Sequence, residues 1–124
     1  MLKQKYISFA KWLRSTYVFP VRLNGYIKNE EKVRLRNGTM AYGSFRCFPK
    51  RTPNIRVASA IEKHMLTRFT EDELHEQIIS SLVHEITHYY QWVLDLKQSD
   101  AVSERQADFY RYRIIDKYMG ENGE

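Results

Sequence analysis

Five consecutive residues, His84-Glu85-Ile86-Thr87-His88, include side chains that could bind a metal ion and activate water. They lie in a segment whose apolar residues recur every three or four positions, which is typical of a helix. Residues four apart share one face of a helix, so His84 and His88 can direct their imidazoles at one ion. Glu85 is turned about 100° away from His84, where it can reach water bound to that ion. A zinc hydrolase requires this division of roles.

The two histidines leave a catalytic zinc site incomplete, because such a site usually has three protein ligands and one open position. One extension of the motif adds a glycine and a third histidine, but Gln91 and Leu94 occupy those positions here. The other two histidines are poor candidates for the third ligand. His75 is predicted to lie on the opposite face of the helix, and His64 lies before the helix begins. A ligand from another element is therefore needed.

The next predicted helix offers that ligand, because Glu104 and Asp108 are four residues apart and share a face. The first helix continues for about 10 Å beyond His88, and a short loop then reverses the chain. An antiparallel helix pair would bring Glu104 level with the histidines, and the small Ala107 would allow close approach. We expect Glu104 to bind the metal. Asp108 is expected to accept the second ring N–H of a ligand histidine and fix its tautomer.

The remaining pattern predicts an α+β fold that places this helix pair beside a small antiparallel sheet of three or four strands. Apolar spacing predicts an N-terminal helix over residues 2–18. The predicted strands cover residues 21–27, 33–36, 40–48 and 55–58. Asn37-Gly38 predicts a hairpin turn between the second and third strands.

Two further helices follow the predicted strands. Thr70 and Glu73 predict a capping box at the start of the long helix, which is expected to end near Leu94. The last helix is expected to begin at residue 101 or 103, to reach Tyr118 and to end at Gly120.

Length and composition restrict the class of protein. A chain of 124 residues predicts a single domain over residues 1–124, and 14% aromatic residues argue against intrinsic disorder. The single cysteine, Cys47, excludes an internal disulfide and a four-cysteine zinc cluster. No apolar run is long enough for a membrane span or a signal-peptide core. We therefore expect a cytoplasmic protein that does not bind a membrane.

The charge is unevenly divided along the chain. Residues 1–69 hold fifteen Lys/Arg and three Asp/Glu, a balance of +12, whereas residues 70–124 have a balance of −7. The two halves could attract each other as layers of one domain, which is the interpretation we favour. Alternatively, the basic half could form a surface for nucleic acid or for an acidic protein.

The motif residues, His84-Glu85-x-x-His88 and Glu104-x-x-Ala107-Asp108, resemble those of the gluzincin group of zinc metallopeptidases. The small ImmA/IrrE-like type is the most similar, and the order of elements resembles a minimal zincin domain. His88-Tyr89-Tyr90 is also similar to SprT-like proteases, which act on DNA-bound proteins. Their usual third ligand is a histidine, and none follows His88 here.

The resemblance implies roles for the site residues. Glu85 would be the general base, while His84, His88 and Glu104 would bind Zn²⁺. A strand before the active-site helix would hold an extended peptide, either residues 55–60 or the outer strand of the hairpin. The expected protein is thus a zinc metallopeptidase that hydrolyses peptide bonds of an intracellular protein.

The expected reaction begins with zinc-bound water, whose pKa the metal lowers towards 7. Glu85 would take a proton as the water attacks the peptide carbonyl, then pass it to the leaving amine. The oxyanion needs a further donor, for which Tyr89, Tyr90, His64 and Arg111 are candidates. Arg111 could instead form an ion pair with Asp108, three residues before it.

Two other hypotheses compete with the enzyme. One is a non-enzymatic binding module of zincin fold, whose basic N-terminal half binds nucleic acid or an acidic partner. The other is a purely structural metal site, in which all coordination positions are closed. The presence of Glu85 beside both histidines favours the enzyme, because a protein without catalytic activity would not need a general base.

Overall fold

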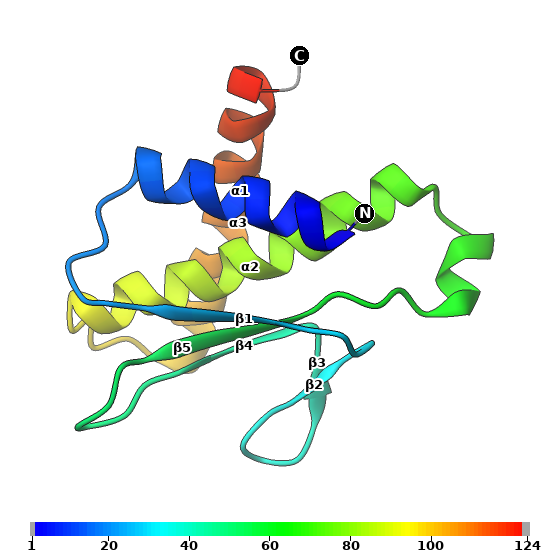
Figure 1. Ribbon diagram of the computed structural model, residues 1–124. Coiled ribbons are helices and arrows are strands. Elements are labelled where there is room, and N and C mark those ends of the chain that lie inside the picture. The colour runs from blue at the N-terminus through cyan, green and yellow to red at the C-terminus, as the bar shows by residue number, and fades with distance from the viewer. Residues whose placement is uncertain (1, 123–124) are drawn as a thin grey trace.

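The protein has an α+β fold, shown by a computed structural model that describes residues 2–122 and omits the side chains of residues 2, 3, 71, 75, 78 and 122 (Figure 1). The helices are α1 (Leu2–Thr16), η1 (Lys63–Thr67, a 3-10 helix), α2 (Glu71–Val93) and α3 (Asp100–Asn122). The strands are β1 (Asn24–Lys28), β2 (Val33–Arg34), β3 (Met40–Ala41), β4 (Gly43–Arg46) and β5 (Asn54–Ala58).

Three of the strands form a mixed sheet in the order β1-β5-β4. Strand β4 pairs antiparallel with β5, as predicted, whereas β1 pairs parallel with β5. The prediction of an antiparallel sheet is therefore wrong for β1. A parallel pair needs a long connection, and the segment between β1 and β5 supplies it, because it contains the hairpin and β4.

The hairpin at Asn37-Gly38 is confirmed, with β2 and β3 paired antiparallel in a second, two-stranded sheet. Gly38 has a φ of 90°, which a side chain would disfavour. The predicted strand over residues 40–48 is divided at Tyr42, so that β3 and β4 belong to different sheets. The fully buried Val33 anchors β2.

Helices α1 and α2 lie on one face of the three-stranded sheet, and the hairpin projects from the other (Figure 1). The core between helices and sheet consists of Tyr6, Phe9, Trp12, Leu13, Ile55, Val57, Val83, Ile86 and Ile115. Side chains two positions apart on a strand point to the same face. Ile55 and Val57 of β5 therefore both point into this core. The helix that contains His84 and His88 is thus held against the sheet by its own apolar face.

Helix α2 begins and ends where the sequence predicts. Thr70 is the N-cap, and its hydroxyl accepts from the Glu73 N–H at 3.1 Å, while the Glu73 carboxylate accepts from the Thr70 N–H at 2.8 Å. This confirms the capping box. The C-cap is Leu94.

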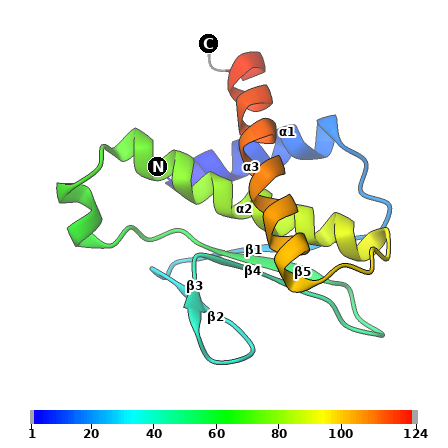
Figure 2. The same cartoon turned by 180° about the vertical axis from the view of Figure 1, so that it is seen from behind.

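Helix α3 crosses α2 and extends beyond α1, away from the sheet (Figure 2). The prediction that it ends at Gly120 is wrong, because the helix continues to Asn122. A contact with α1 supports this last turn: the Trp12 indole N–H donates to the Glu121 carboxylate at 3.1 Å. Such a tertiary contact can offset the helix-weakening effect of a glycine, which is about 1 kcal/mol.

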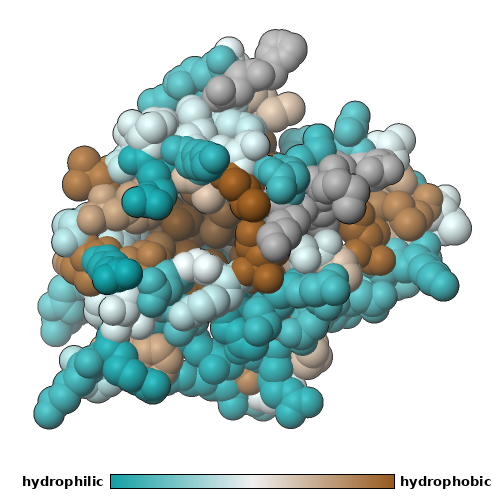
Figure 3. Space-filling model, in the orientation of Figure 1, coloured by the Kyte–Doolittle hydropathy of each residue, from teal (hydrophilic) through white to brown (hydrophobic). Residues whose placement is uncertain are grey.

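Apolar residues gather on part of the front surface, whose lower part is mostly hydrophilic (Figure 3). A hollow of about 870 Å³, lined by both polar and apolar residues, lies between α1, the segment that follows it, and the side chains of Ile55, Leu82 and Ile86. None of the helices among residues 2–122 is long and apolar enough to cross a membrane.

Candidate metal centre

Helices α2 and α3 bring His84, His88 and Glu104 together. The Nε2 atoms of the two histidines lie 3.2 Å apart. One carboxylate oxygen of Glu104 lies 3.0 Å from Nε2 of His84, and the other lies 2.9 Å from Nε2 of His88. The spacing of four residues places the histidines on one face of α2, and the reversal between the helices brings Glu104 opposite them, as expected from the sequence.

The donor atoms are of types that can hold a zinc ion. Two imidazole nitrogens and a carboxylate are common zinc ligands, and a tetrahedral ion with bonds of 2.0–2.1 Å separates its ligands by about 3.3 Å. The two Nε2 atoms lie 3.2 Å apart, close to this value, and each faces a different oxygen of Glu104, at 3.0 and 2.9 Å. With one oxygen of Glu104 as the ligand, the three donor atoms lie within 4.8 Å of one another. The Glu104 side chain is 58% exposed, so solvent can reach the cluster from that side. The three residues therefore fit an ion with an open coordination position.

A buried amide orients His88. Gln91, only 8% exposed, has its Oε1 2.8 Å from Nδ1 of His88, and the Ser103 hydroxyl donates to the same oxygen at 2.6 Å. The Gln91 amide in turn donates to Oε1 of Gln106 and to the Ser103 carbonyl. With a proton on Nδ1, the lone pair of His88 lies on Nε2, the atom that faces Glu104.

This role of Gln91 is not predicted from the sequence above, although its position three residues after His88 places both on one helical face. Ser103 and Gln106 are also missed, because they lie on another helix and no spacing rule connects them to His88.

Asp108 lies beside the other histidine. Its Oδ1 is 3.4 Å from Nδ1 of His84, close enough for charge attraction, yet this nitrogen makes no hydrogen bond within the part of the chain that the structure describes. The expected hydrogen bond between the two is therefore absent in this conformation. The alternative role of Arg111 is confirmed, because its Nη2 lies 3.7 Å from Oδ1 of Asp108.

The Glu85 side chain extends from α2 towards Gly43 of strand β4, and the residue is only 9% exposed. A Cβ atom on Gly43 would lie 3.2 Å from Cγ of Glu85, so the glycine allows the strand to approach this closely. Burial raises the pKa of Glu85 to about 7, and the charge of Glu104 acts in the same direction. The charge of His88 and a backbone hydrogen bond from Phe45 oppose the increase in pKa. The Glu85 carboxyl group therefore holds a proton more readily than an exposed glutamate does.

The proposed oxyanion donors are not brought to this cluster. The buried Tyr89 hydroxyl donates to the Val21 carbonyl and accepts from the Val21 N–H, and the Tyr90 hydroxyl donates to the Val18 carbonyl at 2.5 Å. Both tyrosines instead fix the segment after α1 to α2. Their expected catalytic role is not supported, because these hydroxyls are held by other partners.

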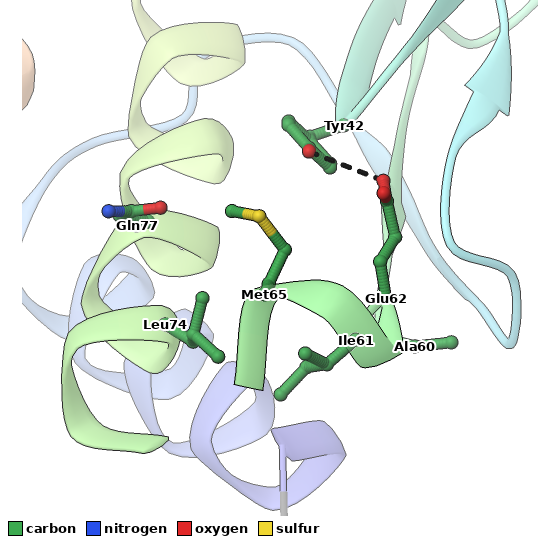
Figure 4. A pocket seen from close by; sticks show the side chains of 7 residues that line it. All are labelled: Tyr42, Ala60, Ile61, Glu62, Met65, Leu74 and Gln77. Atoms are coloured by element: carbon green, nitrogen blue, oxygen red, sulfur yellow. Dashed lines mark hydrogen bonds between the residues drawn. The ribbon is translucent and has the colours of Figure 1, made fainter. Parts of the chain in front are cut away.

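His64 also lies apart from the cluster of His84, His88 and Glu104, in η1. Its Nε2 is 3.4 Å from the Glu62 carboxylate, which also accepts from the Tyr42 hydroxyl at 3.4 Å. A small apolar cavity separates this part of η1 from α2, with Met65, Leu74 and Gln77 among its lining residues (Figure 4). His64 therefore contacts Glu62, two residues before it, and not the cluster between α2 and α3. The side chain of His75, expected on the opposite face of α2, lies outside the described residues.

Replacement of Gln91 with Leu should weaken zinc binding by about 10–100-fold, the usual effect of losing a partner that orients a ligand. Gln91→Glu keeps an oxygen acceptor for His88 but loses the N–H donors to Ser103 and Gln106, so zinc affinity should fall less than in Gln91→Leu. Competition with a chromophoric chelator measures both affinities, and urea unfolding separates loss of affinity from loss of fold. Equal zinc affinities for Gln91→Leu and the unmodified protein would show that Gln91 does not orient His88.

Comparison of the chain with family models, curated proteins and solved structures gave no match.

Proposed function

We propose that the protein is a zinc-dependent metallopeptidase that hydrolyses peptide bonds of a protein substrate, with His84, His88 and Glu104 as the metal ligands. The observation that supports this most strongly is the convergence of three potential ligands, whose donor atoms lie within 4.8 Å of one another, with Glu85 one residue from the first of them. The order of helix, sheet, motif-bearing helix and glutamate-bearing helix is compatible with a minimal zincin-like domain.

The chemistry is divided between the metal and the chain. When bound by the three ligands, zinc would act as a Lewis acid that polarises a carbonyl and acidifies water. Glu85 would accept the proton of the attacking water and return it to the leaving amine. Gln91 would keep the Nε2 lone pair of His88 directed at the ion.

The substrate peptide is proposed to lie along β4. Strand β5, the first alternative inferred from the resemblance, is paired on both sides by β1 and β4 and has no free edge over residues 54–58. Within the described residues β4 pairs with β5 alone, so its outer edge can accept an extended peptide. Phe45 in this strand donates a backbone hydrogen bond to Glu85, which places the proposed base beside the edge.

The proposed activity can be tested with zinc-loaded protein and a mixture of unfolded intracellular proteins. New N-termini should appear in mass spectra, disappear after treatment with a chelator, and return when zinc is restored. Cleavage that persists in protein shown by elemental analysis to hold no zinc would contradict the proposal.

A further inference from the structure

The face of the sheet that the helices leave open contains a second hollow, which basic and polar residues share with Leu35 and Phe45. A hollow of about 310 Å³ lies between the hairpin turn and β4, and its lining includes Arg36, Asn37, Ser44 and Arg46. Phe45 packs its ring against Tyr89 and Trp92 on the helix side of β4. Because strand side chains alternate, Ser44 and Arg46 point to the opposite side, towards the hairpin.

Buried donors in this hollow lack partners. Ser44 is 5% exposed, and its hydroxyl makes no hydrogen bond to any described residue. The same holds for the buried Nε–H of Arg46, although its Nη2 donates to the Arg34 carbonyl at 2.9 Å. A buried donor without a partner is unfavourable, so a ligand that accepts hydrogen bonds would be favoured here.

The charge around the hollow indicates an anion. Residues 32–61, which contain the hairpin, β4 and β5, carry seven Lys/Arg and no Asp/Glu. No ion pair among the described residues joins a cation of residues 1–69 to a carboxylate of residues 70–124. The interpretation that the two halves attract each other as layers is thus not supported by direct contacts. Lys32 pairs with Glu62 at 3.5 Å, and the other six cations of residues 32–61 form no ion pair with a described residue. Their charge remains available to a partner.

An exposed aromatic ring lies on the same face. The register places Tyr26, Arg56 and Ser44 in one row across β1, β5 and β4. Tyr26 is 49% exposed and stands two strand spacings, about 10 Å, from Ser44. A stacking ring beside a cation and a hydroxyl suits a nucleotide better than an acidic peptide, because a base can stack on the ring while its phosphate meets the donors.

We propose that this open sheet face binds single-stranded nucleic acid, with a backbone phosphate in the hollow formed by Arg36, Ser44 and Arg46. A single free phosphate would use only the cations that line the hollow, whereas a polyanion could also contact other cations of this segment. The site lies on the side of β4 opposite Glu85, and it requires neither zinc nor peptidase activity.

Fluorescence anisotropy of a labelled oligothymidine tests the proposal. Ser44→Ala removes only a hydroxyl without a partner, so it should leave stability unchanged or raised while weakening oligonucleotide binding about fivefold. Arg36→Gln should weaken binding about tenfold and reduce the slope of log affinity against log salt by about one. Both variants should bind zinc as the unmodified protein does.

Arg113→Gln is the matched control. Arg113 on α3 lies 5.1 Å from the Phe109 ring, much as Arg36 lies 5.3 Å from the Phe48 ring, and both arginines are exposed. The control should change affinity less than twofold. If Arg113→Gln weakened binding as much as Arg36→Gln, the attraction would be general and the proposed site would be wrong.

Competitors distinguish other anions from nucleic acid. Inorganic phosphate and poly-glutamate, added at the same concentration of negative charge as unlabelled oligothymidine, should each displace the probe far less well. Equal displacement by phosphate would make the hollow a small-anion site, and equal displacement by poly-glutamate would favour an acidic protein. Either result, or no oligonucleotide binding at low salt, would overturn the proposal.

Discussion

Glu85→Gln should leave zinc bound and reduce the rate of peptide cleavage by about 10²–10⁴-fold, the range that a general acid–base group contributes. The amide has nearly the same shape as the carboxylate, so it fits beneath Gly43, where a Cβ atom on the glycine would lie only 3.2 Å from Cγ of Glu85. It cannot accept the proton of attacking water. Zinc content and cleavage rate, measured on the same preparation, separate loss of the base from loss of the metal.

Glu76→Gln is a suitable control, because it makes the same chemical change at an exposed position of α2. This variant should retain both zinc and cleavage. Proteolysis by Glu85→Gln at the rate of the control would exclude Glu85 as the general base, whatever the metal content.

Glu104→Ala should weaken zinc affinity by more than about 100-fold, whereas Asp108→Ala should weaken it by no more than the 10–100-fold typical of an outer partner. Glu104 places oxygens 3.0 and 2.9 Å from the two Nε2 atoms. Asp108 approaches only Nδ1 of His84, at 3.4 Å. Competition with a chromophoric chelator at neutral pH measures both affinities.

Asp116→Ala controls for the loss of an exposed carboxylate from α3, and it should bind zinc as the unmodified protein does. Equal affinities for Glu104→Ala and Asp116→Ala would remove Glu104 from the set of ligands. The metal would then have only the two histidines from this chain, which is too few for the proposed site.

The helical part of the site could be predicted because its determinants are local. The capping box at Thr70 and Glu73 fixes where α2 begins, and a spacing of four residues fixes which side chains share a face. The loop between α2 and α3 is short. It therefore restricts where Glu104 can lie, and a position opposite His88 is one of the few that it allows. These features depend on residues near each other in sequence.

The strand pairing of the sheet and the hydrogen bonds through which Gln91 orients His88 could not be predicted in the same way, because they depend on residues far apart in sequence. Parallel pairing of β1 with β5 is set by contacts across a long connection, and no local pattern specifies it. Trp12 supports the helix beyond Gly120 from more than 100 positions away. The contact of Gln91 with Gln106 likewise becomes visible only when α2 and α3 are packed.

The most direct test of the metal centre is the zinc content of untagged protein, measured by elemental mass spectrometry after reconstitution at neutral pH. The geometry of His84, His88 and Glu104 predicts about one zinc ion per chain, as for other sites with three protein ligands. Protein that takes up no zinc under these conditions would contradict the proposal. The three side chains would then form only a hydrogen-bonded cluster between α2 and α3.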